Sequence, residues 1–422
     1  MIKNKKVNDV FVKYNIKTIK KYHKNSNDKA LNVVYEIHCD CNEFKLMQEL
    51  KQLHEFFNYI ELIPKNEIEY KPPILGFTPN DYSEELLWFL NKIEARRAWE
   101  ISKNYLPVKI AITDNGFDPL HEDLLDNIIY EHGNVWHIDT SLPHYSHGTG
   151  VSGLAAMTTE NIKGYSSIGG LNSKLMLYKG LNYSNIKAAA DDGARVINAS
   201  WSGSLYSTIN QNDINYAYNK GAVIVAAAST TDYCKYPACY DNVIAVAGTN
   251  LSDIKFHGSG HYPEVDVSAP AENLVCPIVG GSHDEYSFTS GWTSGAAALV
   301  TGLCGMIISV HPDLTPEEVE YILKSTADPI DHLPGNSLYI GRLGAGRINA
   351  YRAVLCSKKL SEPIILSGGI SGSYEKYHVN ITHGVSTGDI NIKTKDLTIN
   401  GPFEAGLNNS LIIDNDFIIN CN

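Results

Sequence analysis

Apolar residues in the middle of the chain form short, nearly uninterrupted runs. Residues 108–113 read Val-Lys-Ile-Ala-Ile-Thr, a pattern typical of a parallel strand buried on both faces. A second run, residues 286–310, carries no charged side chain and is rich in Gly, Ser and Thr. Its length would allow a membrane span, but this content of small polar residues favours a buried central helix. The pattern predicts a buried strand and a core helix, and no membrane span.

The two ends of the chain differ in pattern from this middle part. Residues 31–37 and 57–63 are strand-like, and apolar residues at positions 44, 47, 50 and 53 mark one face of a helix between them. Beyond residue 362, short β-prone pieces alternate with Gly, Asn and Asp turns. We expect three domains: a small α+β domain at 1–75, a central domain at 76–361 and a small β-rich module at 362–422.

Composition and charge exclude some classes of protein. Of the 422 residues, 43% are hydrophobic and 19% are charged, as expected for a globular protein with a large core. The net charge is −12, yet residues 1–30 hold nine lysines against Asp9 and Asp28, so they carry +7 and the remainder carries −12 − 7 = −19. No basic patch interleaved with aromatic residues follows, so we interpret the lysines as a solvated surface and expect no nucleic-acid partner.

Three short motifs carry candidate chemistry. Asp114 follows the predicted strand of residues 108–113, at the carboxyl end where α/β sheets place their sites. His147 opens a Gly-rich helix, and Ser294 opens the uncharged helix, where backbone N–H groups stabilise negative charge. Each motif alone more often has a structural explanation, as a turn, a surface histidine or a close-packed helix. Their order and their gaps, 147 − 114 = 33 and 294 − 147 = 147 residues, together favour the triad of a serine hydrolase.

These motifs, with the segments at 86–93, 196–203, 223–228 and 344–350, resemble the subtilisin-like serine proteases. The resemblance covers roughly residues 84 to 356. It implies an α/β fold with a mostly parallel central sheet flanked by helices, preceded here by the small α+β domain and followed by the β module. It also implies an endopeptidase that acts on polypeptide substrates.

The resemblance assigns a role to each site residue. Asp114 would orient His147, and His147 would take the proton of Ser294, which forms the acyl-enzyme. An extended peptide substrate would pair with a short cleft segment formed by Ser200, Trp201, Ser202 and Gly203. No cofactor is required. Calcium often stabilises the family, but no carboxylate cluster has a spacing that locates it, so we assign no metal ligand.

Several positions depart from the usual pattern of the family. Ser229-Thr230 stands where Gly-Asn is usual, so we expect the Thr230 hydroxyl to replace an amide that donates to the oxyanion. Trp292 precedes Thr293 at the nucleophile, and Ala298 stands where proline is usual. Two alternatives remain open: a peptide ligase or cyclase on the same scaffold, and a non-catalytic pseudoprotease that binds peptides.

By position, residues 1–75 resemble the inhibitory propeptide of these proteases, which would make the N-terminal segment an intramolecular inhibitor; an unrelated domain is the alternative. The first six residues are basic and lack the apolar core of a signal peptide. We expect a secreted or cell-surface protein, with a cytoplasmic location as the alternative.

The chain has eight cysteines. Cys234 and Cys239 flank a short loop and could form a local disulfide. Cys304 is expected to be a buried thiol. Cys39 and Cys41 lack companions at a spacing that would bind zinc.

Overall fold

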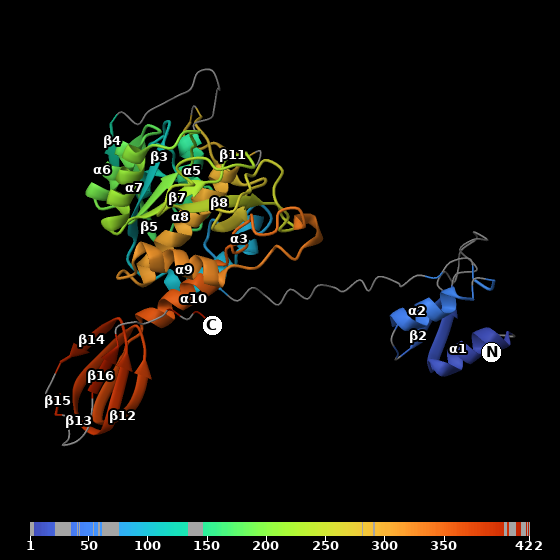
Figure 1. Cartoon of the computed structure of the whole chain (residues 1–422). Coiled ribbons are helices and arrows are strands. Elements are labelled where there is room, and N and C mark those ends of the chain that lie inside the picture. Colours follow the sequence, from blue (N-terminus) through green and yellow to red (C-terminus); the bar gives the residue numbers. More distant parts are fainter. Residues whose placement is uncertain are drawn as a thin grey trace. The chain divides into compact units, whose positions relative to one another are not determined.

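The computed structural model divides the chain into two compact units, Met1–Pro72 and Pro73–Asn422 (Figure 1). The described residues are 4–21, 35–39, 41, 43–53, 55–57, 60, 76–133, 147–280, 282–289, 292–400, 403–404, 411–414, 419 and 421. Each unit has a buried apolar core of its own. The boundary lies close to the predicted one at residue 75, and the division into three domains stays a prediction.

A seven-stranded parallel sheet forms the centre of the larger unit (Figure 1). The strands lie in the order β4-β5-β3-β6-β7-β8-β9, so the earliest of them along the chain, β3, lies inside the sheet. The strands are β3 Val108–Asp114, β4 Ile128–His132, β5 Ser173–Lys179, β6 Val196–Ala199, β7 Val223–Ala227, β8 Ile244–Thr249 and β9 Val267–Pro270. The predicted parallel sheet is confirmed.

Both faces of this sheet are apolar, which explains why its strands read as continuous hydrophobic runs. Along β3, Ile110 and Ile112 enter one buried cluster, whereas Ala111 enters the cluster on the other face. Two pairs of helices add residues to these clusters. They are α5 His147–Ala156 and α8 Thr293–Val310 on the first face, and α6 Tyr183–Asp191 and α7 Thr208–Asn219 on the second.

Helix α8 is the core helix predicted from the uncharged run. It packs on β6, β7, β8 and β9 and against α5, and Figure 1 shows it in the middle of the unit. A Cβ atom at Gly302 would overlap the carbonyl oxygen of Ala155, so this glycine allows α5 and α8 to pack closely. Within the described residues, α8 alone is long and apolar enough to cross a membrane, and 94% of it is buried inside the fold.

Shorter elements complete the body of the larger unit. They are α3 Trp88–Lys92, α4 Ala95–Ser102, α9 Pro316–Thr326, α10 Ala350–Ser361, the 3₁₀ turns η2 Leu125–Asn127 and η3 Pro334–Asn336, and the antiparallel pair β10 Val275–Pro277 and β11 Tyr286–Phe288. Helix α9 begins where the sequence would place it, because Thr315 and Glu318 form a reciprocal capping box and proline takes the first helical position.

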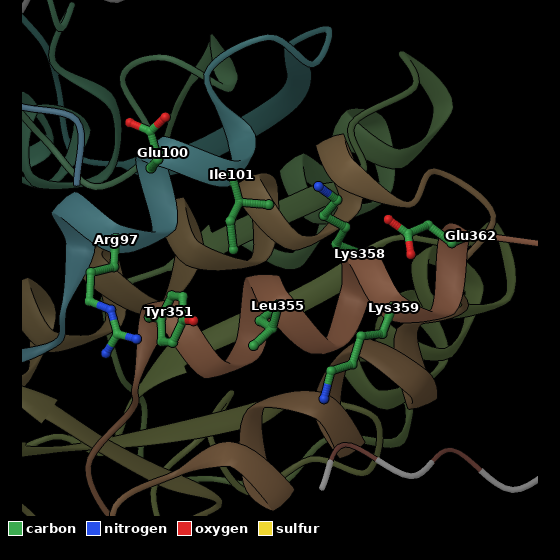
Figure 2. A pocket seen from close by; sticks show the side chains of 8 residues that line it. All are labelled: Arg97, Glu100, Ile101, Tyr351, Leu355, Lys358, Lys359 and Glu362. Atoms are coloured by element: carbon green, nitrogen blue, oxygen red, sulfur yellow. The ribbon is translucent and has the colours of Figure 1, made fainter. Parts of the chain in front are cut away.

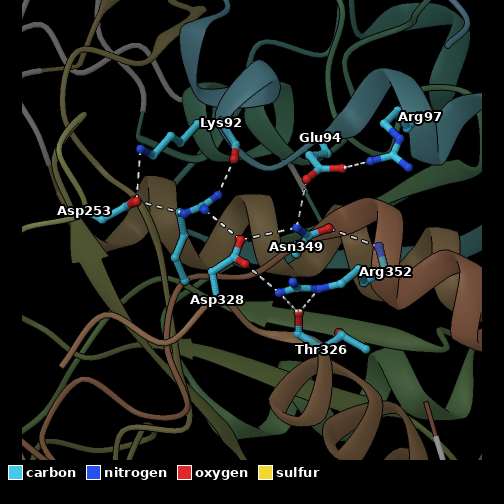
Figure 3. A network of polar contacts seen from close by, with 9 residues as sticks. Lys92, Glu94, Arg97, Asp253, Thr326, Asp328, Asn349 and Arg352 are labelled. Atoms are coloured by element: carbon cyan, nitrogen blue, oxygen red, sulfur yellow. Dashed lines mark hydrogen bonds and ion pairs between the residues drawn. The ribbon is translucent and has the colours of Figure 1, made fainter. Parts of the chain in front are cut away.

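A polar network joins the α3–α4 region to the start of α10 (Figure 3). The carboxylate of Asp328 accepts hydrogen bonds from Arg347 and Arg352 at 2.6 Å each and from Asn349 at 3.2 Å. Arg347 also pairs with Asp253 at 2.9 Å and donates to the backbone carbonyl of Lys92. The network fixes segments that are far apart in the sequence.

The N-terminal unit contains two helices and a hairpin-like pair of strands. Its elements are α1 Lys5–Lys13, β1 Ile16–Lys21, β2 Tyr35–Cys39 and α2 Glu43–Lys51. The predicted helix face is confirmed at Leu50, which is buried with Val7, Val10 and Phe11 of α1, and Leu53 packs against the same cluster; Leu46, which was not predicted, is buried there as well. The lysine-rich start therefore forms an amphipathic helix, which the charge pattern did not predict. Residues 58–59 and 61–63 of the predicted second strand lie outside the described residues.

The C-terminal module is built from parallel strands. They are β12 Ile364–Glu375, β13 His378–Lys393, β14 Asp396–Ile399, β15 Phe403–Glu404 and β16 Leu411–Asp414. Strand β12 pairs in parallel with β13, and β13 pairs in parallel with β14, β15 and β16. The offset between paired residues is 379 − 364 = 15 at Ile364 and 411 − 390 = 21 at Ile390. Residues Leu366, Val379, Ile381, Ile390 and Ile392 share its core. This arrangement is a short parallel solenoid.

Side chains of this module contact the helices around the central sheet of the same unit. Tyr377 is buried, and its hydroxyl donates to Glu318 of α9 at 3.2 Å. A disulfide joins Cys356 of α10 to Cys421. His311, which follows α8, lies 3.0 Å from His378 of β13, measured between their Nε2 atoms. Burial, and then the neighbouring His378, lower the pKa of His311 to about 4, so its ring is neutral at pH 7.

The remaining cysteines follow the sequence prediction in part. Cys234 and Cys239 form the expected local disulfide, and Cys304 is a buried free thiol. Cys39 and Cys41 are also joined to each other, which leaves neither thiolate available to a metal.

Candidate active site

Asp114 and His147 lie in direct contact although 33 residues separate them. Asp114 ends strand β3 and is fully buried, and His147 is the first residue of α5. Nδ1 of His147 lies 2.9 and 2.8 Å from the two carboxylate oxygens of Asp114. The same carboxylate accepts the backbone N–H of Asn115 at 2.7 Å. Because an ionised carboxylate only accepts, Nδ1 of His147 carries the proton and Nε2 carries the lone pair that can act as a base.

The glycine after His147 allows this contact. A Cβ atom at Gly148 would overlap the carbonyl oxygen of Gly116 and lie 2.9 Å from Cβ of Asp114. Helix α5 can therefore begin directly against the carboxyl end of β3 only because this position lacks a side chain. The His-Gly pair of the motif thus has a physical reason within this chain.

The environment of His147 favours the protonated ring. Burial lowers its pKa, but the charge of Asp114 and its hydrogen bond outweigh burial and hold the pKa above its usual value of 6.5. A histidine in this position accepts a proton more readily than a free imidazole does, which suits a general base.

Ser294 lies in the first turn of α8, and the cleft segment residue Ser200 follows β6. The Ser294 hydroxyl donates to the backbone carbonyl of Ser200 at 3.2 Å, and the Ser200 hydroxyl donates to the carbonyl of Ser294 at 3.1 Å. Ser294 is partly exposed, whereas every other residue of α8 is buried. The candidate nucleophile is thus the one side chain of this helix that solvent and substrate can reach.

The other cleft residues contact side chains and backbone of the surrounding strands, helices and loops. The Trp201 indole donates to the Thr113 hydroxyl at 3.0 Å and meets the Tyr183 ring edge-on at 5.1 Å. The Ser202 hydroxyl donates to that of Ser229 at 3.2 Å. Gly203 exchanges two backbone hydrogen bonds with Tyr236, at 2.6 and 3.0 Å. The backbone of Gly203 is therefore already paired within the protein.

Thr230 lies in the loop after β7 and is exposed. The preceding Ser229 has a left-handed φ of 62°, a conformation that usually favours glycine. Its carbonyl oxygen accepts the N–H of Gly260 at 2.8 Å and the Thr293 hydroxyl at 3.1 Å. The loop that carries Thr230 is thereby fastened to the residue next to Ser294.

One contact between aromatic rings and one Asp–His pair were not predicted from the sequence. The ring of Trp292 lies 5.9 Å from that of His147, with 30° between their planes. A second Asp–His pair joins the buried carboxylate of Asp118 to Nδ1 of His283 at 2.8 Å. Trp292 directly precedes Thr293, so its departure from the family pattern was a usable signal. His283 lies 165 residues from Asp118 and no local motif marks it.

Two buried carboxylates could hold a hard cation. Asp123 is fully buried and Asp81 nearly so, and burial raises the pKa of Asp123 to about 7. Asp123 accepts from the Asn161 amide at 2.8 Å and from the N–H of Tyr165 at 3.0 Å. Neither carboxylate pairs with lysine or arginine within the described part of the chain. The sequence analysis assigned no metal ligand and did not single out this pair.

A separate pocket of about 520 Å³ lies between α4 and α10 (Figure 2). Its wall is mostly charged and polar, with the guanidinium of Arg97 3.4 Å from the centre of the Tyr351 ring. The residues that line it belong to α4 and α10 and the residue after α10, whereas the triad candidates belong to β3, α5 and α8.

The sequence profile described as the subtilase family (Peptidase S8) matches residues 107–355. The chain belongs to this family. It is 33% identical over 306 residues to a thermophilic serine proteinase of Bacillus sp. (strain AK1), covering 68% of this chain and 73% of that protein. It is also 33% identical over 291 residues to thermitase of Thermoactinomyces vulgaris, covering 66% of this chain and 99% of that protein. The protein is therefore a subtilisin-like serine protease, as the sequence indicated.

A solved structure supports the same fold for this subtilase. A protease of Pseudoalteromonas arctica PAMC 21717 aligns with a TM-score of 0.58 and 25% identity, over 67% of this chain and all of that one. Among the relatives is an extracellular protease, the halolysin-like Nep of Natrialba magadii, at 28% identity over 69% of this chain and 56% of that protein.

Proposed function

We propose that this subtilase is an endopeptidase whose triad is Asp114, His147 and Ser294. The observation that carries the proposal is the contact of 2.8 Å between Nδ1 of His147 and the buried carboxylate of Asp114. A buried carboxylate fixes the tautomer of a histidine at a helix start, and a partly exposed serine follows two residues after Trp292, whose ring lies 5.9 Å from that histidine. These are the components that activate a hydroxyl nucleophile.

In the proposed reaction, Nε2 of His147 takes the proton as the Ser294 oxygen attacks the peptide carbonyl. The hydroxyl first rotates away from the Ser200 carbonyl toward His147, since such contacts often tighten only when substrate binds. Asp114 stabilises the imidazolium that forms. His147 then gives the proton to the leaving amine, and water hydrolyses the acyl-enzyme by the same exchange.

The oxyanion would be stabilised at the start of α8. The N–H of Ser294 supplies one donor, and the positive end of the helix adds to it. Thr230 is the proposed second donor, because the Ser229–Thr293 hydrogen bond holds its loop beside the first turn of α8. The peptide would lie along the cleft segment, with the Ser200 carbonyl and the backbone of Ser202 as its partners.

Replacement of Ser294 by alanine tests the proposal. The parent should cleave casein and react stoichiometrically with a serine-directed phosphonate, and Ser294→Ala should do neither while keeping the parent's circular dichroism. Ser252→Ala, which removes an exposed serine elsewhere, serves as the matched control and should behave as the parent. A folded parent that does not react with the phosphonate would favour the pseudoprotease.

We also propose that the chain is exported and that its N-terminal unit acts as an intramolecular inhibitor. Export is supported by the three disulfides, which persist in oxidising compartments, and by the extracellular relative. The inhibitor role is supported by the position of this compact unit ahead of the catalytic domain.

Asp81 and Asp123 are the residues we propose for the calcium expected from the family. Calcium prefers carboxylate oxygens, and the two carboxylates lie close enough that the charge of Asp81 adds to burial in raising the pKa of Asp123. Bound calcium would neutralise two buried acids and so stabilise the fold; it supplies no step of the hydrolysis.

A further inference from the structure

Two histidines and an aspartate converge where the C-terminal solenoid meets the catalytic body. His311 directly follows α8, Asp313 lies two residues on, and His378 begins β13. The Nε2 atoms of the two rings are 3.0 Å apart. One ligand atom from each of the three side chains lies within 4.8 Å of the other two.

The protonation of His378 is fixed by a carboxylate behind it. Its Nδ1 lies 3.3 Å from the carboxylate of Asp396, so Nδ1–H donates there and the lone pair of Nε2 points toward His311. A histidine that binds a metal almost always donates its other ring N–H in this way. The carboxylate therefore orients His378 as a ligand.

His311, the second histidine of the cluster, is buried and has one ring nitrogen without a partner among the described residues. The residue is 1% exposed, and its Nδ1 has no hydrogen-bond partner among the described residues. Because the lone pair of His378 Nε2 accepts, Nε2 of His311 carries the proton when no ion is bound, and Nδ1 of His311 keeps an unpaired lone pair. When an ion binds at Nε2 of His311, that proton moves to Nδ1. A metal ion at Nε2 of His311 would be a stronger interaction than the hydrogen bond between the two rings.

The distances suit a small divalent ion. Zinc–nitrogen bonds of about 2.0–2.1 Å in a tetrahedral site place two ligating nitrogens roughly 3.3 Å apart. The observed 3.0 Å requires the rings to separate by only a few tenths of an ångström. The exposed carboxylate of Asp313 supplies the third ligand, and a water molecule would complete the site.

We propose that His311, Asp313 and His378 bind a divalent transition-metal ion, with zinc as the best match, that fastens the C-terminal solenoid to the catalytic body. Imidazole nitrogen favours zinc and its neighbours over calcium or magnesium. The offset of 311 − 294 = 17 residues places the site about 25 Å along α8 from the nucleophile, so the ion takes no part in hydrolysis. The proposal is independent of the proposed triad.

Zinc and cobalt binding to the full chain test this site. After treatment with a chelator and its removal, the parent should bind one equivalent of Zn²⁺ in competition with a chromogenic chelator. Co²⁺ should give the intense visible absorption of a four-coordinate ion, and Zn²⁺ should raise the Tm. His378→Gln should lose all three effects. Asp396→Asn should weaken binding by about 10–100-fold because it removes the orienting carboxylate.

Asp313→Asn keeps the proposal testable if a histidine variant does not fold, because Asp313 is exposed. It should weaken Zn²⁺ binding at least about tenfold. Glu264→Gln is the matched control: it alters a second group of candidate ligands, Cys234, Cys239 and Glu264, and should bind as the parent does. Absence of stoichiometric Zn²⁺ in the parent, or equal affinity in the parent, His378→Gln and Asp313→Asn, would overturn the proposal and leave an ordinary hydrogen bond between the rings.

Discussion

The buried carboxylate of Asp114 acts on His147 through two separate effects. It fixes the proton on Nδ1, which frees Nε2 to accept a proton, and it raises the pKa of the ring against the opposing effect of burial. Only the first effect sets the tautomer, and only the second moves the pH at which the base becomes available. A single substitution at Asp114 removes both, and the pH dependence reports the second.

Asp114→Asn should move the acidic limb of the pH profile of kcat/KM to lower pH. Activity requires the neutral ring, so it rises as the pH passes the pKa of His147; without the carboxylate, burial alone remains and lowers that pKa. The rate above the limb should also fall, by about 10⁴-fold, because the amide favours the wrong tautomer. Asp118→Asn, which alters the other Asp–His pair, should leave the limb in place. An unshifted limb in Asp114→Asn would show that His147 is not the titrating base.

Thr230 is the position at which a gain in rate is expected. Thr230→Asn supplies a longer amide donor and should raise kcat by up to about 10²-fold with little change in KM, because the interaction forms in the transition state. Thr230→Val keeps the shape without the hydroxyl and should lower kcat if threonine already donates. If both variants stay within about twofold of the parent kcat, the activation free energy has changed by less than about 1 kcal/mol. Thr230 then does not contact the oxyanion.

The sequence predicted site residues well where a motif and an element end coincide. Asp114 closes a buried strand and Ser294 opens a buried helix, so the period of the apolar residues placed both. Trp292 and His283 could not be placed in the same way. Their contacts with His147 and Asp118 depend on how two loops fold over α5, and loop paths follow from tertiary packing.

At the scale of elements, charged side chains hold segments that carry little apolar surface. The carboxylate of Asp328 accepts hydrogen bonds from two arginines (Figure 3). One is Arg347, whose side chain is 9% exposed, and the other is Arg352 of α10. Removal of Asp328 leaves the buried guanidinium of Arg347 with one counter-charge fewer, and uncompensated buried charge costs more than an ion pair contributes.

Asp328→Asn should lower the free energy of unfolding by roughly 1–3 kcal/mol, less than for a fully buried pair, because the Asp328 side chain is 28% exposed and Asp253 still neutralises Arg347. Urea unfolding in the Ser294→Ala background measures the change without self-digestion. Asp191→Asn is the control: Asp191 accepts from Lys187, Lys220 and Tyr216, but at the surface, and its loss should change stability little. Equal effects of the two substitutions would contradict the role given to burial.

The elements that the sequence did not predict share a physical cause. Helix α1 buries Val7, Val10 and Phe11, yet its lysines dominate the composition of that segment. The solenoid strands look like any short β pieces, because parallel pairing of successive coils is set by contacts 15 to 21 residues apart and not by local alternation. Local periodicity identifies an element more readily than it identifies its partner.

At the scale of the whole molecule, the compact unit Met1–Pro72 has the core of a domain that can fold on its own. The first described residues of the larger unit are packed against its own core. Phe77 and Tyr82 contact that core, and Arg96 donates a hydrogen bond to the Thr78 hydroxyl at 2.5 Å. A cut ahead of Phe77 would therefore keep these contacts of the larger unit.

If the N-terminal unit is a propeptide, the active parent should shorten itself between Tyr70 and Phe77, and Ser294→Ala should remain at full length. Bonds next to Pro72 and Pro73 are poor sites, because proline lacks an N–H and fixes the backbone. Intact mass measured after refolding gives the cleavage point. Added parent should then cut Ser294→Ala at the same bond, which separates loss of the nucleophile from misfolding. An active parent that keeps its full mass would rule out self-processing and leave residues 1–72 as an independent domain.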